Sequence, residues 1–308
     1  MMTANHTTLE RCLKEGRTIY EQLQLAASYL QAEGVDEARE NAELLLLHVL
    51  KLERAQLLLQ WRDIFPSEVL PTWGECLQRK GNGEPVQYII GRAWFYGRSF
   101  EVSPAVLIPR PETELLVEAI LQQAMPWEKE ALNVLDVGTG SGAIAVTLAS
   151  ERPEWNVIAS DLSPAALGQA KENARQLGVL ERMTWVEGDL LEPFNHGQAL
   201  TLHTQSIDIL VSNPPYIPQR DMEGLQREVK DYEPHLALVG GVDGLDPYRI
   251  MLDTLSSLKQ KPRLVAFELG IHQPVIVAEM LRELQAWDEV HIIRDYAGIE
   301  RHVLAIKK

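Results

Sequence analysis

The sequence predicts an α/β protein in which a doubly wound, mostly parallel sheet follows a small all-helical region. Three observations predict it. Beyond Pro111, strand-like and helix-like segments alternate, which is typical of a doubly wound sheet. From Thr18 to about Lys80, apolar residues recur with a helical period and strand signals are few. Residues 79–110 carry closely spaced glycines and alternating aromatic and β-branched residues, which favours a β-hairpin connector.

Four helical pieces are expected in the helical region, and in the first of them apolar residues fall on a single face and Gly34 is suited to the C-terminal cap. No cluster of chemistry-bearing residues stands out in the region, so its composition favours a packing or recognition module. We therefore expect three parts: a helical domain at residues 1–80, a β-hairpin linker at 81–105 and a catalytic-type α/β domain at 106–308.

Seven strands are expected in the α/β domain, and each is a short run of mainly apolar residues. These runs are 132–138, 155–161, 183–189, 207–213, 263–270, 289–295 and 301–307. Only the short segment "DYAGIE" separates the last two, which is too short for a parallel crossover. The sequence therefore predicts a seven-stranded, mostly parallel sheet whose last strand is antiparallel.

Charge and composition exclude several classes of protein. The chain has 308 residues, and its 29 Lys and Arg against 44 Asp and Glu give a formal net charge of -15. Such an acidic surface repels phosphate backbones, so DNA binding is disfavoured. Cys12 and Cys76 lack metal-ligand spacing, and no metal site is expected. The polar N-terminus and the lack of a run of about 18 apolar residues predict a cytoplasmic protein without a membrane span.

The first candidate binding feature is the turn "GTGSG", residues 138–142, directly after a strand and before a helix. It comprises Gly138, Thr139, Gly140, Ser141 and Gly142. Glycines there allow close approach of a ligand to the backbone, and a helix N-terminus offers N–H donors to a negative group. The G-x-G-x-G spacing differs from the G-x-G-x-x-G of dinucleotide enzymes.

The next two strands end in further candidate ligand contacts. Asp161 is placed to accept both hydroxyls of a ribose. Asp189 can accept from an exocyclic adenine amine while the backbone N–H of Leu190 meets a ring nitrogen. Together these strand ends indicate a cofactor that contains adenosine. S-adenosylmethionine fits a turn flanked by an acid, Asp136, and NAD remains the competitor.

The fourth strand ends in "NPPY", residues 213–216. Asn213 can accept one hydrogen of a substrate NH₂ group, and the Pro214 carbonyl can accept the other because Pro215 has no N–H. Tyr216 offers a flat face to a planar, conjugated group. The corner is thus predicted to seat a planar NH₂ and to favour a pyramidal nitrogen in the transition state.

The order of motifs along nearly the whole chain resembles the PrmC/HemK family, the protein-(glutamine-N5) methyltransferases that modify peptide chain release factors. The matching segments are "GEPVQYIIG", "FYGRSFEVSPAVLIPRPETELLVE", "VLDVGTGSGAIAVTLA", "SNPPYI", "EPHLALVGGVDGLDPYRIM", "FELG" and "DYAGIERHVLA". The resemblance implies the class I S-adenosylmethionine-dependent methyltransferase fold, which is Rossmann-like.

The resemblance also implies roles for the candidate residues. The 138–142 turn, Asp161 and the Asp189–Leu190 corner would hold S-adenosylmethionine, with Asn213 beside it. Residues 213–216 would bind the glutamine of the Gly-Gly-Gln loop of class I release factors. "PRPETE" would help to close the site, and Phe100 would pack near the methyl group. The helical domain would recognise the release factor, and a monomer is expected.

Three alternatives remain open at this stage. The corner fits an adenine amine as well, so DNA adenine-N6 methylation is the rival that the net charge disfavours. Methylation of a ribosomal-protein glutamine is a second rival, and a non-catalytic adenosine-binding scaffold is a third. The loop at 192–205 is longer than the family suggests, and about fifteen N-terminal residues look like an extension.

Overall fold

The computed structural model describes residues 9–308 except 11, 128–129, 198–205 and 259. Most of the long loop and part of the N-terminal extension therefore lie outside the described residues. The chain divides into two compact units, Met1–Gly91 with Gln226–Tyr232 and Arg92–Leu225 with Glu233–Lys308. Among the helices of the described residues, none is long and apolar enough to cross a membrane.

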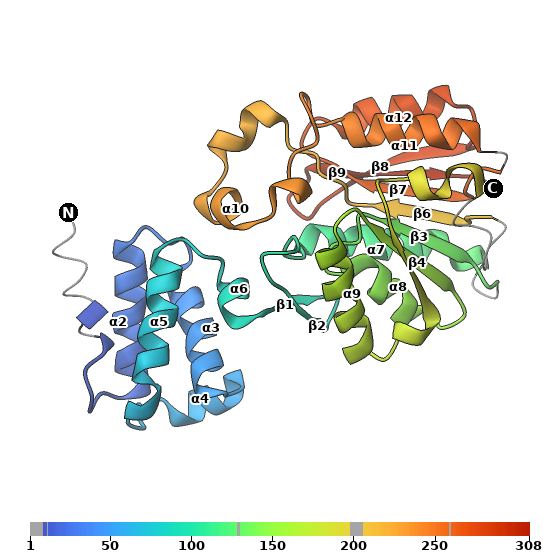
Figure 1. Ribbon diagram of the computed structural model, residues 1–308. Coiled ribbons are helices and arrows are strands. Elements are labelled where there is room, and N and C mark those ends of the chain that lie inside the picture. The colour runs from blue at the N-terminus through green and yellow to red at the C-terminus, as the bar shows by residue number, and fades with distance from the viewer. Residues whose placement is uncertain (1–8, 11, 128–129, 198–205, 259) are drawn as a thin grey trace. The chain divides into compact units, whose positions relative to one another are not determined.

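The first unit is all-helical, and its apolar faces meet in one core that includes the fully buried Trp73. In Figure 1 the longer helices, α2, α3 and α5, lie side by side. Its elements are α2 (Ile19–Ala32), α3 (Ala38–Leu50), α4 (Arg54–Gln60), η1 (Ser67–Val69), α5 (Leu70–Gly81), α6 (Val86–Ile90) and α10 (Arg227–Tyr232).

Local sequence accounts for the ends of α2. Thr18 and Glu21 form a reciprocal capping box at its start, with Glu21 N–H donating to Thr18 Oγ1 at 3.2 Å. At its end Gly34 has a φ of 79° and donates to the Gln31 carbonyl at 3.1 Å, while Val35 donates to the Leu30 carbonyl. This is the glycine-terminated end that the sequence predicts.

A distant segment completes the first unit. Lys80 is 1% exposed, and its ammonium pairs with Glu228 of α10. The Tyr232 hydroxyl donates to the Asn82 carbonyl at 3.1 Å. A buried lysine is stable when it is paired, so Glu228 satisfies a charge that the helical unit could not otherwise bury. The helical unit thus contains residues from well beyond the predicted 1–80 range.

The connector between the helices and the sheet is only partly the hairpin that the sequence predicts. Residues 86–90 form the short helix α6, since Pro85 precedes it and Gly91, with a φ of 75°, ends it. The hairpin itself consists of β1 (Arg92–Phe95) and β2 (Arg98–Glu101), which pair antiparallel. Its two-residue turn has positive φ at both Tyr96 and Gly97, the backbone of a tight hairpin turn.

The second unit contains the predicted seven-stranded sheet, in the order β5-β4-β3-β6-β7-β9-β8. The last strand, β9, runs antiparallel to both of its neighbours, and the other pairs are parallel. The strands are β3 (Asn133–Val137), β4 (Asn156–Asp161), β5 (Met183–Glu187), β6 (Ile209–Ser212), β7 (Leu264–Glu268), β8 (Glu289–Arg294) and β9 (Glu300–Ile306). The predicted fold class is confirmed.

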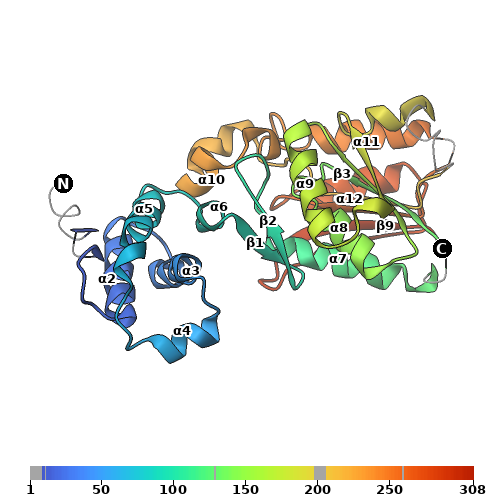
Figure 2. The same cartoon turned by 60° about the horizontal axis from the view of Figure 1, so that its bottom comes forward.

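Helices cover both faces of this sheet. Buried residues of α7, α8 and α9 pack on one face, and those of α11 and α12 pack on the other (Figures 1 and 2). The helices are α7 (Pro111–Gln123), α8 (Ala143–Glu151), α9 (Pro164–Gln176), α11 (Asp246–Ser257) and α12 (Pro274–Glu283). Short 3₁₀ turns lie at η2 (Met125–Trp127), η3 (Leu180–Arg182), η4 (Glu192–Gly197), η5 (Gln219–Gly224) and η6 (His235–Ala237).

Candidate active site

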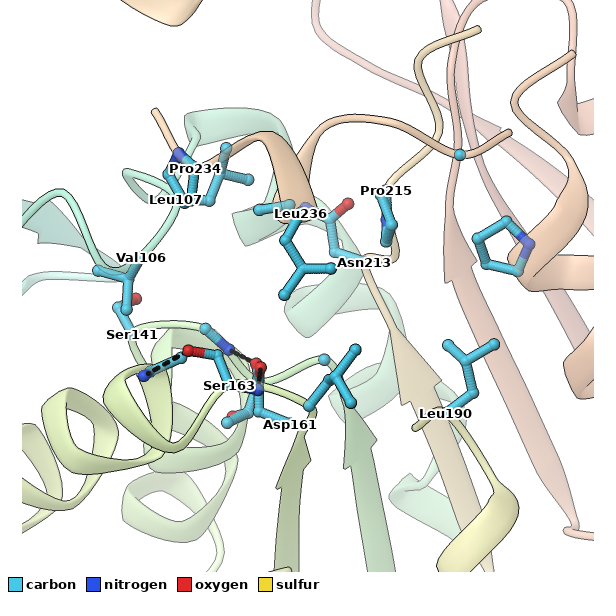
Figure 3. Close-up of a pocket in the computed structure, with 18 of the residues that line it drawn as sticks. Val106, Leu107, Ser141, Asp161, Ser163, Leu190, Asn213, Pro215, Pro234 and Leu236 are labelled. Carbon is cyan, nitrogen blue, oxygen red and sulfur yellow. Dashed lines mark hydrogen bonds between the residues drawn. The ribbon is translucent and has the colours of Figure 1, made fainter. Parts of the chain in front are cut away.

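A cavity of about 320 Å³ lies at the carboxyl ends of the parallel strands in the second unit. This edge is where open α/β sheets bind ligands. Figure 3 shows Ser141, Asp161 and Ser163 on one side of the cavity, with Asn213 and Pro215 facing them. Leu190 lies beyond Asp161, and Val106, Leu107, Pro234 and Leu236 close the remaining wall.

The glycine-rich turn follows β3 and begins α8, as predicted. Its three glycines have φ values between 56° and 82°, a left-handed backbone that other residues adopt only with strain. A Cβ added at Gly138 or Gly140 would meet no atom within 4 Å, so the backbone is open to close approach by a ligand there. The N–H groups of Gly138 and Thr139, however, both donate to the Ser160 carbonyl at 2.9 Å. They fix the turn and are not free for a ligand.

Asp161 ends β4 and links the turn to the next helix. One oxygen accepts from Gly140 N–H at 2.8 Å, and the other accepts from Ser163 N–H at 2.9 Å. Burial raises the pKa of Asp161, and these backbone hydrogen bonds oppose the rise. Each carboxylate oxygen retains a second lone pair, so the group can still accept from ribose hydroxyls while its orientation is fixed.

Asp136 lies within β3 and is completely buried. Its Oδ2 accepts from Thr139 Oγ1 at 2.7 Å and from Ala145 N–H at 3.1 Å. Its Oδ1 is buried and has no hydrogen-bond partner in the described part of the chain. Burial raises the pKa of Asp136 to about 7 although both hydrogen bonds lower it. Asp136 has no exposed surface and does not line the cavity, so it fixes the glycine-rich turn from within and does not contact a ligand.

Asp189 and Leu190 follow β5, and both line the cavity. Asp189 is exposed, so its carboxylate is available to a ligand. Leu190 has a φ of 45°, which is unusual for a branched residue and costs on the order of 1–3 kcal/mol. Such strain persists where the surroundings impose it, and here it sets the direction of the Leu190 N–H.

The corner after β6 brings Asn213 into the cavity wall together with Pro215. Asn213 Nδ2 donates to Thr113 Oγ1, at 3.4 Å, on helix α7. Thr113 is 4% exposed and also lines the cavity. Since its NH₂ is engaged, the amide of Asn213 keeps its carbonyl oxygen available as an acceptor.

Pro214 and Tyr216, which also belong to the corner, are less accessible than the sequence suggests. Pro214 is buried, and no described residue donates a hydrogen bond to its carbonyl. Tyr216 is half-buried and packs against the core between the sheet and α11–α12, and it does not line the cavity. Burial raises the pKa of Tyr216 to about 12, with Glu268 adding to the rise. Stacking of a substrate on Tyr216 therefore stays a prediction.

Phe100 lies elsewhere than the predicted substrate site. It is 0% exposed and packs edge-to-face on Phe95, with ring centroids 6.0 Å apart, in the core beneath α7 and α8. A side chain without exposed surface cannot contact a substrate. Phe100 is a core residue, and its predicted position near the methyl group is corrected accordingly.

Sequence reasoning missed several residues that shape the site. "PRPETE" is next to the cavity, as predicted, with Arg110 in its wall and paired to the buried Glu233. The wall formed by Ile250 of α11 and by five loop residues was not predicted; the five are Leu236, Ala237, Val239, Gly240 and Gly241. Neither was Gln273, whose amide reaches the Tyr216 carbonyl at 2.9 Å. A glutamine before a proline-initiated helix was the available signal.

The sequence matches two family models and many named relatives. Residues 21–91 match the PrmC N-terminal domain, and residues 134–232 match a methyltransferase domain. The release factor glutamine methyltransferase of Bacillus cereus is 42% identical over 93% of this chain and 98% of its own length. The chain belongs to the release factor glutamine methyltransferase family. It is therefore an enzyme that transfers methyl groups.

Other members of the family are similarly related along their whole length. The Moorella thermoacetica enzyme is 40% identical and covers 94% of this chain and 99% of its own. Among solved structures, the N-terminal domain of human METTL16 is 15% identical, has a TM-score of 0.51 and covers 89% of this chain and 95% of its own. That likeness supports the methyltransferase fold alone.

Proposed function

We propose that this protein transfers a methyl group to the side-chain amide nitrogen, N5, of the glutamine in the Gly-Gly-Gln loop of class I release factors, and so modulates translation termination. The observation that carries the proposal is the corner after β6. It places an amide carbonyl, that of Asn213, in the wall of the cavity that also contains the glycine-rich turn and Asp161. Family membership supports a glutamine amide as the group that this acceptor receives.

The chain's own residues suit the proposed cofactor. The backbone at Gly138 and Gly140 is open to close approach by the methionine part of S-adenosylmethionine. Asp161 is held by two backbone N–H groups and can accept from a ribose. Asp189 and the Leu190 N–H would read the adenine. When bound, S-adenosylmethionine supplies an electrophilic methyl group.

The amide seat explains how a weak nucleophile can react. The lone pair of an amide nitrogen is conjugated with its carbonyl, and this conjugation underlies a rotation barrier of about 18–20 kcal/mol. Two acceptors, Asn213 Oδ1 and the Pro214 carbonyl, would bind the two hydrogens of a pyramidal nitrogen better than those of a flat one. Holding the nitrogen in place supplies the rest of the acceleration through proximity. The proton released after transfer passes to solvent.

We propose that the helical unit recognises the release factor. Its described surface exposes several large apolar side chains close together in the sequence, Leu58, Leu59 and Ile64. The match of residues 21–91 to a domain that is named for this family supports the role. A monomer in the cytoplasm remains our prediction for the working form of the protein.

A single labelling experiment tests the proposed function. The protein is incubated with radiolabelled S-adenosylmethionine and, separately, with a class I release factor, a ribosomal protein mixture or duplex DNA. We expect label on the release factor alone. A release factor whose Gly-Gly-Gln glutamine is replaced should stay unlabelled, and the Asn213→Ala variant should bind the cofactor but transfer at least a hundredfold more slowly.

The alternatives give different outcomes. Label on DNA alone would replace the proposal with adenine methylation, and label on ribosomal protein alone would replace the substrate. Cofactor binding with no transfer to any of the three substrates would favour the third alternative, a non-catalytic adenosine-binding scaffold. Full activity of Asn213→Ala would contradict the proposed role of the corner.

A further inference from the structure

Gln273 lies outside the cavity, yet its side chain is turned into the protein. It immediately precedes α12 and is only 7% exposed. Its backbone N–H donates to the Gly270 carbonyl at 3.2 Å, and its own carbonyl accepts from Val277 N–H at 3.1 Å. The main chain of Gln273 is thus fixed at the start of the helix, and the carboxamide projects from a rigid base.

The carboxamide of Gln273 connects three segments of the second unit. Its Oε1 accepts from Gly270 N–H at 2.8 Å. Its Nε2 donates to the Tyr216 carbonyl at 2.9 Å and, at longer range, to the Gly244 carbonyl at 3.3 Å and the Asp243 carbonyl at 3.4 Å. Both ends of the amide are therefore used, and the shortest bond from Nε2 goes to the last residue of the Asn213–Tyr216 corner.

The loop of residues 238–244 packs closely against the Asn213–Tyr216 corner. A Cβ on Gly240 would lie 2.4 Å from the Pro215 carbonyl oxygen, and one on Gly244 would lie 2.2 Å from the Tyr216 carbonyl oxygen. Ile217 continues the contact, because its N–H donates to the Leu238 carbonyl at 2.9 Å and its carbonyl accepts from Gly240 N–H at 3.0 Å. The backbone of residues 215–217 is therefore in direct contact with the backbone of the loop.

This packing matters for the cavity because both partners line it. Pro215 comes from the corner, and Val239, Gly240 and Gly241 come from the loop. The prolines restrict φ at 214 and 215, so the direction of the Pro214 carbonyl depends on how the chain is held on either side of it. Thr113 holds the side chain of Asn213 before it, and Gln273 holds the Tyr216 carbonyl after it.

We propose that Gln273 is a positioning residue for methyl transfer. It anchors the Tyr216 carbonyl to the loop 243–244 and to the start of α12, and so keeps the Pro214 carbonyl and Asn213 aligned with the glutamine amide. The inference rests on the proposed function, since the corner is the amide seat only if a glutamine is the substrate. Gln273 itself touches neither substrate nor cofactor.

Replacement of Gln273 by methionine is the first test. Methionine keeps a similar volume and removes both hydrogen-bonding ends. We expect the single-turnover rate of methyl transfer to a class I release factor to fall about ten- to hundredfold, because small displacements of reacting groups are costly. The dissociation constant for S-adenosylmethionine, measured by calorimetry, should change no more than about threefold.

The matched control is a carboxamide at the amino ends of the parallel strands, opposite the cavity. Asn133 begins β3, and its Nδ2 donates to the Ser206 carbonyl at 3.0 Å. Asn133→Leu removes this bond and the one that Asn133 Oδ1 accepts from Asn156 Nδ2 at 3.1 Å, so it also loses both ends of a carboxamide, but far from the corner. It should lower the melting temperature to a similar extent while its single-turnover rate stays within about twofold of the wild type.

Gln273→Glu tests the bond to Tyr216 without a change of shape. A neutral carboxyl can donate one hydrogen to the Tyr216 carbonyl, whereas an ionised one repels it, and burial among carbonyls favours the neutral form. The ratio of variant to wild-type rate should therefore fall as pH rises. The titratable and charged groups on the elements around Gln273 are common to both proteins: Tyr216, Asp243, Asp246, Tyr248, Arg249, Glu268, His272, Arg301 and His302.

The outcomes separate this inference from the proposed function. If the wild type labels the release factor and Gln273→Met transfers as fast as Asn133→Leu, Gln273 is not a positioning residue. A rate ratio for Gln273→Glu that does not change with pH would likewise overturn it. If the wild type does not label the release factor at all, the proposed function fails, whatever the variants do.

Discussion

Asn213 and Thr113 are 100 residues apart in sequence, yet the side-chain NH₂ of Asn213 donates to the hydroxyl oxygen of Thr113 at 3.4 Å. Asn213 follows β6, and Thr113 lies in the first turn of α7. The bond orients the amide so that its carbonyl oxygen remains for a substrate. Thr113 therefore supports the proposed amide seat through Asn213 and does not need to contact the substrate itself.

Thr113→Val should slow transfer without weakening cofactor binding. Valine has the same shape and lacks the acceptor, so the Asn213 amide loses a hydrogen bond of about 1 kcal/mol and can turn away. We expect kcat to fall about five- to tenfold, with the S-adenosylmethionine Kd unchanged. Thr113→Ser should restore the rate.

A second buried threonine provides the control for this substitution. Thr147 of α8 is 0% exposed, and its hydroxyl has no partner among the described residues. Thr147→Val should therefore leave kcat unchanged. If Thr113→Val did the same, the orientation of Asn213 would not depend on that hydroxyl.

Asp161→Asn should weaken cofactor binding strongly. The carboxylate accepts from Gly140 N–H and Ser163 N–H on its two oxygens, and an amide would turn an NH₂ toward one of these donors. The variant also loses an acceptor for the ribose. We expect the Kd for S-adenosylmethionine to rise about ten- to hundredfold, as titration calorimetry would measure. A Kd within twofold of the wild type would exclude Asp161 from the cofactor site.

Asn173→Leu should disturb the glycine-rich turn, residues 138–142, on the side that faces the protein interior. Asn173 is 0% exposed, donates to the Ser141 carbonyl at 2.8 Å and exchanges hydrogen bonds with the backbone of Glu101. Its removal leaves buried backbone groups unpaired, at about 1–3 kcal/mol each. We expect a lower melting temperature and a Kd for S-adenosylmethionine at least tenfold higher.

The exposed Gln176 lies on the same helix and donates to the Glu101 side chain, so it serves as the comparison for Asn173. Gln176→Leu should change neither quantity measurably, since exposed polar contacts contribute little. Equal effects of the two substitutions would mean that the link from Asn173 to Ser141 has no special importance.

The sequence predicts the sheet well, and it places Asp161 and Asp189 at the edge where the cavity lies, because these signals are local. Each strand is a short apolar run, and Asp161 and Asp189 follow strands whose carboxyl ends share one edge. A residue at such a position can be assigned without knowing its partners. The same holds for the Asn213–Tyr216 corner, whose prolines mark a forced end to the strand.

What the sequence does not predict depends on contacts between distant residues. Thr113 meets Asn213, and Gln273 meets Tyr216 57 residues away, so neither has a local signature. The predicted contact of Phe100 fails for a related reason. A side chain on a strand can point to either face of the sheet. Phe100 points toward Phe95 and the core beneath α7, and so away from the cavity.

Asp136 should make the stability of the cofactor-free protein depend on pH. Its pKa is about 7 in the folded protein and 3.8 ordinarily, so between these values the folded state binds more protons than the unfolded state. The stability from Asp136 is thus complete below about pH 4 and is lost as pH rises through 7. The free energy of unfolding of the wild type should fall over this range relative to that of Asp136→Asn.

Urea unfolding between pH 4 and pH 8 measures this difference. Asparagine can keep the bonds to Thr139 and Ala145 with its oxygen in the place of Oδ2, while its NH₂ cannot ionise. A difference between the two proteins that is constant with pH would show that Asp136 does not titrate in this range.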